Sequence, residues 1–314
     1  MKIYLLSLLA FCSLFCLNAC KETEAQLEPS NIINTYSVPQ SNNAFDQTIV
    51  DYYKKYDSYL LYKFTEKDAY WTPTGWKKPI QLPAGSWQAG GEVAPADEAF
   101  IPNQLELIRT KWFNFYSDKF LKKFLPTKIL LCSKVDSIST GFVFGGPTVT
   151  YVKQTKKVGA FYNYDNIQVN YGDASVNSMT AAETRLFVAK INLVFIQSII
   201  ARGLSNPSDE FINSADYVTS MTTIAQANGR GIIVGFSGAT AQRDWDAYIT
   251  AMVSYSSVNL TTATANTNSS PMGILNATKD INGLIKKRYD MVRNYFIKEY
   301  NVDLQLIGNA SKGI

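Results

Sequence analysis

The stretch LFVAKINLVFIQSIIARGL, residues 186–204, decides the fold more than any other part of the chain. The preceding Thr180-Ala181-Ala182-Glu183 is a capping box, a sequence signal that starts a helix. Gly203 fits the position that follows the end of a helix. One long helix is therefore predicted from this capping box to about Arg202. Ile191, Phe195 and Ile199 recur every four residues as an apolar stripe, which predicts that the helix lies in the core.

Apolar patterns on both sides of this helix predict a helix-rich α+β fold with a small sheet in the first half of the chain. Helical spacing predicts further helices over residues 45–62, 103–124, 214–227, 241–253 and 279–302. Strand-like runs cover residues 128–133, 141–149 and 158–164, and a short strand is predicted at 304–307.

The N-terminus has the layout of a secretory signal peptide. Met1-Lys2 is positively charged, residues 3–17 are almost wholly apolar, and Leu17-Asn18-Ala19-Cys20 closes the segment. This ending resembles a lipobox, so we expect a lipoprotein signal peptide over 1–19 and a diacylglycerol and palmitate on Cys20. The alternatives are an ordinary signal peptide or a membrane-spanning helix, for which the apolar run is short.

Residues 20–43 are polar and predict a lipidated flexible tether, which leaves residues 44–314 as one domain. The acidic residues after Cys20 resemble the surface-export signal of lipoproteins in Bacteroidetes-type bacteria. This resemblance implies a lipid anchor in the outer membrane and exposure on the cell surface, and the alternative is a tether that faces the periplasm.

Composition excludes several kinds of site. The 314 residues contain no histidine, so no Ser-His-Asp triad, Cys-His pair or His-ligated zinc can form. After removal of 1–19, 29 basic and 26 acidic residues give a net charge of +3, too weak for a nucleic-acid partner. Cys132 then has no partner for an internal disulfide, and its apolar surroundings predict a buried, inert thiol.

Several stretches together resemble a family of zinc metallohydrolase lipoproteins associated with SusC/SusD-type TonB-dependent importers. They include residues 121–130 (LKKFLPTKIL), the Asn192-Leu193-Val194-Phe195 lead-in of the long helix, Gly235-Phe236-Ser237, and the closing residues 286–296. In that family, a Phe precedes His-Glu-x-x-His, which places two zinc ligands and a general base on one helical face. The resemblance covers nearly all of the chain after the signal peptide and implies a zincin-like metallohydrolase fold.

The same resemblance implies a degenerate member that lacks the HExxH motif. The ligand histidines fall on Ile196 and Ile200, the catalytic glutamate on Gln197, and the acidic third ligand on Ala247. These four positions would line a vestigial metal pocket. We therefore expect no catalytic residues, no metal, no cofactor and a pseudoenzyme. The alternative is that the apolar stripe is simply core; both interpretations give a packed helix without metal.

The first functional hypothesis is a non-catalytic surface lipoprotein accessory to an outer-membrane SusC/SusD-type nutrient importer. It would capture an oligosaccharide or a peptide, or stabilise the complex. Trp71, Trp76 and Trp87, in a Gly/Pro-rich region, are candidate contacts for a ligand or partner. A second hypothesis is a glycoside hydrolase that uses a carboxylate pair, Asp209-Glu210 or Asp244/Asp246. A third is a purely structural surface lipoprotein.

Overall fold

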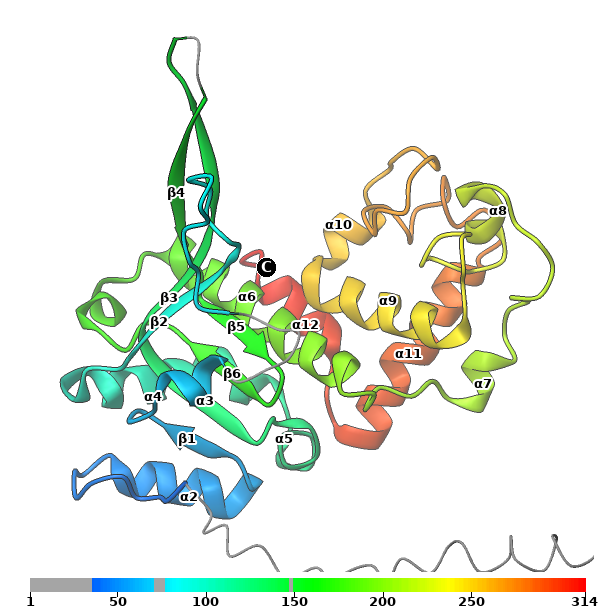
Figure 1. The fold of residues 1–314 in the computed structure, drawn as a ribbon. Helices are drawn as coiled ribbons and strands as arrows, with labels where there is room; N and C mark the ends of the chain where they lie inside the picture. The colour runs from blue at the N-terminus through cyan, green and yellow to red at the C-terminus, as the bar shows by residue number, and fades with distance from the viewer. Residues whose placement is uncertain (1–35, 71–76, 147–148) are drawn as a thin grey trace, which may run out of the picture. The chain divides into compact units, whose positions relative to one another are not determined.

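The fold is an α+β arrangement in which a six-stranded sheet precedes most of the helices (Figure 1). The computed structural model describes residues 36–70, 77–146 and 149–314. Residues 38–314 form one unit, which begins slightly before the predicted boundary at residue 44. Every strand in the described residues lies between residues 59 and 169, so the predicted helix-rich α+β class with a sheet in the earlier part of the chain is confirmed.

The sheet is organised around one long strand. Its members are β1 (Tyr59–Leu61), β2 (Gly90–Pro95), β3 (Lys128–Phe144), β4 (Val149–Lys157), β5 (Ala160–Asn163) and β6 (Asn166–Val169). The first residues of β3 pair in parallel with β1 and β6, and β5 closes that edge antiparallel to β6. The later part of β3 pairs antiparallel with β2 and β4. Leu130 and Leu131, in the first part of β3, are fully buried, so this part of the strand belongs to the hydrophobic core.

The second part of β3 and all of β4 form a hairpin arm that projects from the body (Figure 1). Every residue of β4 is exposed, and Phe144 near the tip is 83% exposed. The two runs predicted at 128–133 and 141–149 therefore belong to one strand and its hairpin partner, not to two core strands.

Short helices cover the sheet: α2 (Asp46–Tyr56), α3 (Glu66–Tyr70), α4 (Ile101–Lys111) and α5 (Asp118–Phe124), with 3-10 turns at Glu98–Phe100, Phe113–Phe115 and Ala174–Ser178. The single helix predicted over 103–124 is wrong, because the Ser117 side chain accepts from the Phe120 amide and starts a separate helix. The helix predicted over 45–62 is too long, because Asp57 adopts a left-handed conformation (φ 57°) and β1 follows.

Later helices pack beyond α6 (Ala181–Ala201). They are α7 (Asp209–Ile212), α8 (Ile224–Gly229), α9 (Ala241–Ser254), α10 (Ser257–Thr261), α11 (Leu284–Tyr300) and α12 (Leu304–Ala310). Within the range predicted as a helix at 214–227, only the residues from Ile224 onward are helical, and they form the start of α8. The strand predicted at 304–307 is wrong: the Asp303 carboxylate accepts from the Gln305 amide and starts a helix instead.

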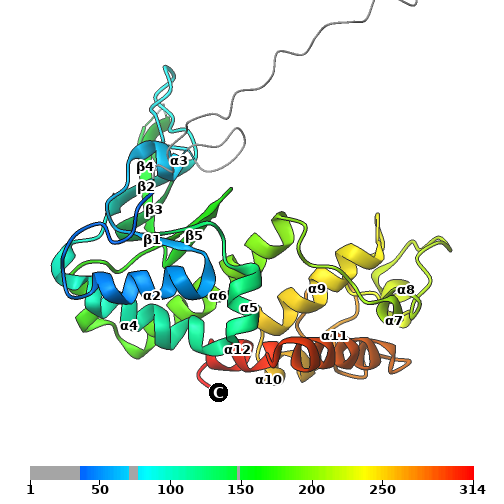
Figure 2. The same ribbon diagram turned by 90° about the horizontal axis from the view of Figure 1, so that it is seen from below.

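Helix α6 lies between these two sets of elements (Figures 1 and 2). It contacts β5 and β6 on one side and α9 and α12 on the other. Both halves of the predicted capping box are present, since Thr180 Oγ1 accepts from the Glu183 amide and Glu183 accepts from the Thr180 amide. The helix is long and apolar enough to span a membrane, but half of its most apolar window is buried inside the protein. It is a core helix of this unit.

Candidate functional site

One face of α6 borders a cavity near the C-terminal end of the helix. Ile196 is only 2% exposed and Ile200 is half-buried. Both side chains line this cavity, together with Ile199. Residues i and i+4 share a helical face, so the four-residue spacing of Ile196 and Ile200 accounts for their common direction.

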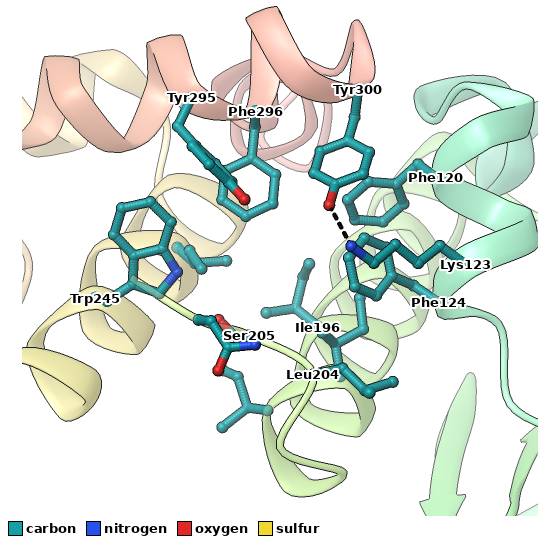
Figure 3. Close-up of a pocket in the computed structure, with 14 residues that line it drawn as sticks. Phe120, Lys123, Phe124, Ile196, Leu204, Ser205, Trp245, Tyr295, Phe296 and Tyr300 are labelled. Carbon is teal, nitrogen blue, oxygen red and sulfur yellow. Dashed lines mark hydrogen bonds between the residues drawn. The ribbon is translucent and has the colours of Figure 1, made fainter. Parts of the chain in front are cut away.

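The cavity has a volume of about 50 Å³, and its walls are built mainly from aromatic and aliphatic side chains (Figure 3). Helices α5, α6, α9 and α11 supply nearly all of the lining. Each contributes side chains three to five residues apart, which is how amphipathic helices present one face to a shared centre. The lining residues are Phe120, Lys123, Phe124, Ile196, Ile199, Ile200, Leu204, Ser205, Asn206, Trp245, Ile249, Tyr295, Phe296 and Tyr300.

Among the polar side chains of the lining, which also include Ser205 with a buried hydroxyl that has no partner among the residues described, Lys123 and Trp245 face the cavity from opposite sides (Figure 3). The Lys123 ammonium donates to the Tyr300 hydroxyl at 2.8 Å and also lies 5.2 Å from the Phe124 ring centroid. Trp245 is fully buried, and its indole Nε1–H has no hydrogen-bond partner among the residues described. Figure 3 shows that this nitrogen is turned towards the space that Ser205 and Ile196 border.

The structure brings two of the four positions predicted for a vestigial metal pocket to this cavity. Ile196 and Ile200 line the cavity, and α6 packs against α9 as expected. Gln197 and Ala247 do not line it: Gln197 is exposed and Ala247 is half-buried. Trp245 and Ile249 face the cavity from α9, and Ala247 lies midway between them in sequence. It therefore points about 200° away around the helix.

A buried ion pair joins α9 and α11, and it also holds the loops around Tyr217 and residues 233–234. The fully buried Asp244 carboxylate accepts from Arg288 Nη2 at 2.9 Å, the Tyr217 hydroxyl at 3.0 Å, and the backbone amides of Ile233 and Val234. Burial raises the pKa of Asp244, and the Arg288 guanidinium and the donated hydrogen bonds oppose that rise. Both carboxylate oxygens are engaged in holding the fold together.

These contacts weigh against the carboxylate pairs proposed for glycoside hydrolysis. Asp244 is engaged by four donors, whereas Asp246 is bonded to Gln242 and burial raises its pKa. Residues i and i+2 point to opposite sides of a helix, so Asp244 and Asp246 do not face a common substrate. Asp209 and Glu210 are exposed at the start of the four-residue α7.

The residues present do not fit the zinc ion that the family resemblance implies. The chain has no imidazole, and the α6 residues that border the cavity are aliphatic. Within the described ranges, no group of three or more Cys, Asp or Glu side chains is placed to hold a metal. Cys132 is fully buried on β3, where burial raises the pKa of its thiol and its Sγ donates to the Leu130 carbonyl.

Of the three tryptophans chosen from the sequence, only Trp87 belongs to the described residues, and it does not line this cavity. Trp71 and Trp76 lie outside the described residues. Trp87 is half-buried against the hairpin arm, where its backbone amide donates to Thr140 and the Lys153 ammonium lies 4.9 Å from its ring centroid. Its contact with a ligand or partner stays a prediction.

Sequence reasoning missed the aromatic walls. Phe120, Trp245 and Phe296 fall within the helices predicted over 103–124, 241–253 and 279–302, but nothing in the sequence indicates that they share a cavity. Their convergence depends on how α5, α9 and α11 pack around α6, which spacing within one helix does not reveal. Lys123 carried a weak signal, because it is a charged residue beside the apolar stripe of α5.

Comparison with known proteins places the chain in a family. Residues 52–305 match the family described as "Putative zinc-binding metallo-peptidase". The chain also resembles a solved structure described as a "putative zinc-binding metallo-peptidase" from Bacteroides caccae, with 10% identity and a TM-score of 0.42. That match covers 85% of this chain and 90% of the other. No curated protein sequence matches the chain. Because the family match spans most of its length, this chain belongs to the zinc-binding metallo-peptidase family.

Proposed function

We propose that this chain is a non-catalytic member of its metallo-peptidase family, a binding protein rather than a hydrolase. The observation that carries the proposal is the α6 face at Ile196 and Ile200. Where the family resemblance expects two zinc ligands, this face presents aliphatic side chains to an apolar cavity. Buried imidazoles without a metal would need new polar partners, whereas isoleucines fill the same space without any.

The proposed setting is the cell surface. The signal peptide and Cys20 support a lipid anchor in the outer membrane, and the acidic residues that follow support export to its outer face. The family resemblance supports a role beside a SusC/SusD-type importer, where the protein captures a ligand or stabilises the complex. The signal peptide and the lipidation site lie within residues 1–35, outside the described part of the chain.

Two measurements test this function. The first is affinity purification of the tagged chain from cross-linked outer membranes, with a different outer-membrane lipoprotein, tagged identically, as control. A SusC/SusD pair enriched only with this chain is the expected result. Its absence from every purification would overturn the importer role.

The second measurement is hydrolysis. The purified chain, with and without added Zn²⁺, is incubated with a mixed peptide library and the products are identified by mass spectrometry. We expect no cleavage above the level of a heat-denatured sample. Cleavage that requires Zn²⁺ and stops on chelation would refute the non-catalytic assignment.

A further inference from the structure

The size of the cavity limits what it can enclose. Its volume of about 50 Å³ is roughly a third of the 150 Å³ cavity that accommodates benzene in an engineered protein core. An aromatic ring is therefore too large for the enclosed part. A short branched alkyl group fits, with the charged end of its molecule at the mouth.

The charge of the lining decides whether the cavity suits a cationic or an anionic ligand. A ring of aromatic faces favours a cation such as a quaternary ammonium group. Here, however, Lys123 is the single charged side chain among the described lining residues, and it is exposed. A cation would be repelled by that ammonium and would find no carboxylate in the wall. The site therefore favours an anion at the mouth, where Lys123 can pair with it.

The unpartnered indole N–H of Trp245 adds a second requirement. A fully buried donor without a partner is costly, and a ligand that supplies an acceptor removes that cost. Figure 3 shows Trp245 and Lys123 on opposite sides of the cavity. One carboxylate is not expected to serve both, so the ligand needs a second acceptor besides its anionic group.

We propose that this cavity binds a small aliphatic residue that carries a free carboxylate and an acylated nitrogen. Its alkyl side chain enters the cavity, its carboxylate pairs with Lys123, and its amide carbonyl accepts from Trp245 Nε1. An N-acyl amino acid and the C-terminal residue of a peptide share this chemistry. The inference rests on the proposed function, because it requires a pocket that binds without cleaving.

The experiment is equilibrium dialysis of the intact chain in lipid nanodiscs against labelled ligands. The probes are N-acetyl-L-valine, its uncharged amide, 3-methylbutanoate, and the tripeptide Ala-Ala-Val. We expect N-acetyl-L-valine to bind at least about tenfold more tightly than either the amide or 3-methylbutanoate, each of which lacks one polar contact. If the tripeptide binds more tightly, the natural ligand is the C-terminus of a peptide. If N-acetyl-L-valine binds more tightly, the natural ligand is a free N-acyl amino acid.

Variants assign the contacts. Lys123→Met keeps the alkyl stem and should weaken N-acetyl-L-valine binding at least about fivefold while leaving the amide unchanged. Lys122→Met is the matched control, because Lys122 is exposed on the same helix and does not line the cavity. Trp245→Phe should reduce the preference over 3-methylbutanoate. Thermal melting shows whether each variant is folded. If a variant does not fold, the comparison of the four ligands on the unmodified chain still tests the inference.

Three results would overturn the inference. They are no saturable binding of N-acetyl-L-valine or the tripeptide at millimolar concentration, equal affinity for the amide, or equal losses in the Lys123 and Lys122 variants. A different result would refute the proposed non-catalytic function. If the chain hydrolyses the tripeptide, chromatography of the dialysed sample would show released valine. A chain that neither binds nor cleaves, yet purifies with an importer, retains the complex-stabilising role.

Discussion

At the scale of single residues, the proposed apolar replacement of the metal site makes a prediction about stability. Ile196→Ala removes a buried side chain next to an existing cavity, so we expect the free energy of unfolding to fall by about 2–5 kcal/mol. Leu186→Ala, on the same helix but 69% exposed, is the control and should cost within about 0.5 kcal/mol. Urea titration measures both. Equal losses would place Ile196 outside the core.

The Asp244–Arg288 pair makes a second residue-level prediction. Asp244→Asn removes the charge that Arg288 faces in a fully buried site, and an uncompensated buried charge costs about 3–5 kcal/mol. Asp290→Asn breaks the exposed Lys286–Asp290 pair and should cost no more than about 1 kcal/mol. Chemical denaturation compares the two, and similar values would contradict a structural role for Asp244.

Cys132 allows a chemical test of the core. Its thiol is fully buried and burial raises its pKa, so the reactive thiolate is scarce in the folded protein. We expect iodoacetamide at pH 8 to leave Cys132 unmodified until urea unfolds the chain, as followed by peptide mass spectrometry. Rapid labelling of the folded chain would show that this part of β3 opens.

At the scale of elements, the start of α6 is a testable cap. Thr180→Ala removes the side-chain oxygen that accepts from the Glu183 amide and should cost about 1 kcal/mol. Thr184→Ala, one turn later, keeps the cap intact and serves as control, with an expected change within about 0.5 kcal/mol. If the two variants melt alike, the capping box does not stabilise the helix.

An element could be predicted from the sequence where neighbouring residues mark its start and end. The start and end of α6 were predicted because a capping box and Gly203 (φ 66°) mark them in the sequence. The 304–307 run failed because a short apolar segment fits a strand and a buried helix equally well. The site was predictable to the extent that Ile196 and Ile200 share one face of α6. Its other walls come from separate helices, whose packing no local pattern encodes.

At the scale of the whole molecule, the predicted lipid anchor on Cys20 determines the mass expected for the mature protein. Cleavage before Cys20 and lipidation of its thiol should give membrane-extracted protein that lacks residues 1–19 and carries acyl chains, as measured by intact-mass spectrometry. Cys20→Ser should abolish both the lipid and the membrane association. A soluble mature form with an unmodified Cys20 would refute the lipoprotein assignment, whatever the cavity binds.

The central claim is that a member of a zinc-binding family has replaced its metal site with an apolar pocket. The most direct test is the zinc content of the native protein, purified without chelators and measured by elemental mass spectrometry against protein concentration. Catalytic zinc needs three protein donors, and this chain has no histidine to supply them. We predict far less than one zinc per chain, before and after dialysis against micromolar Zn²⁺. One tightly held zinc per chain would contradict the account.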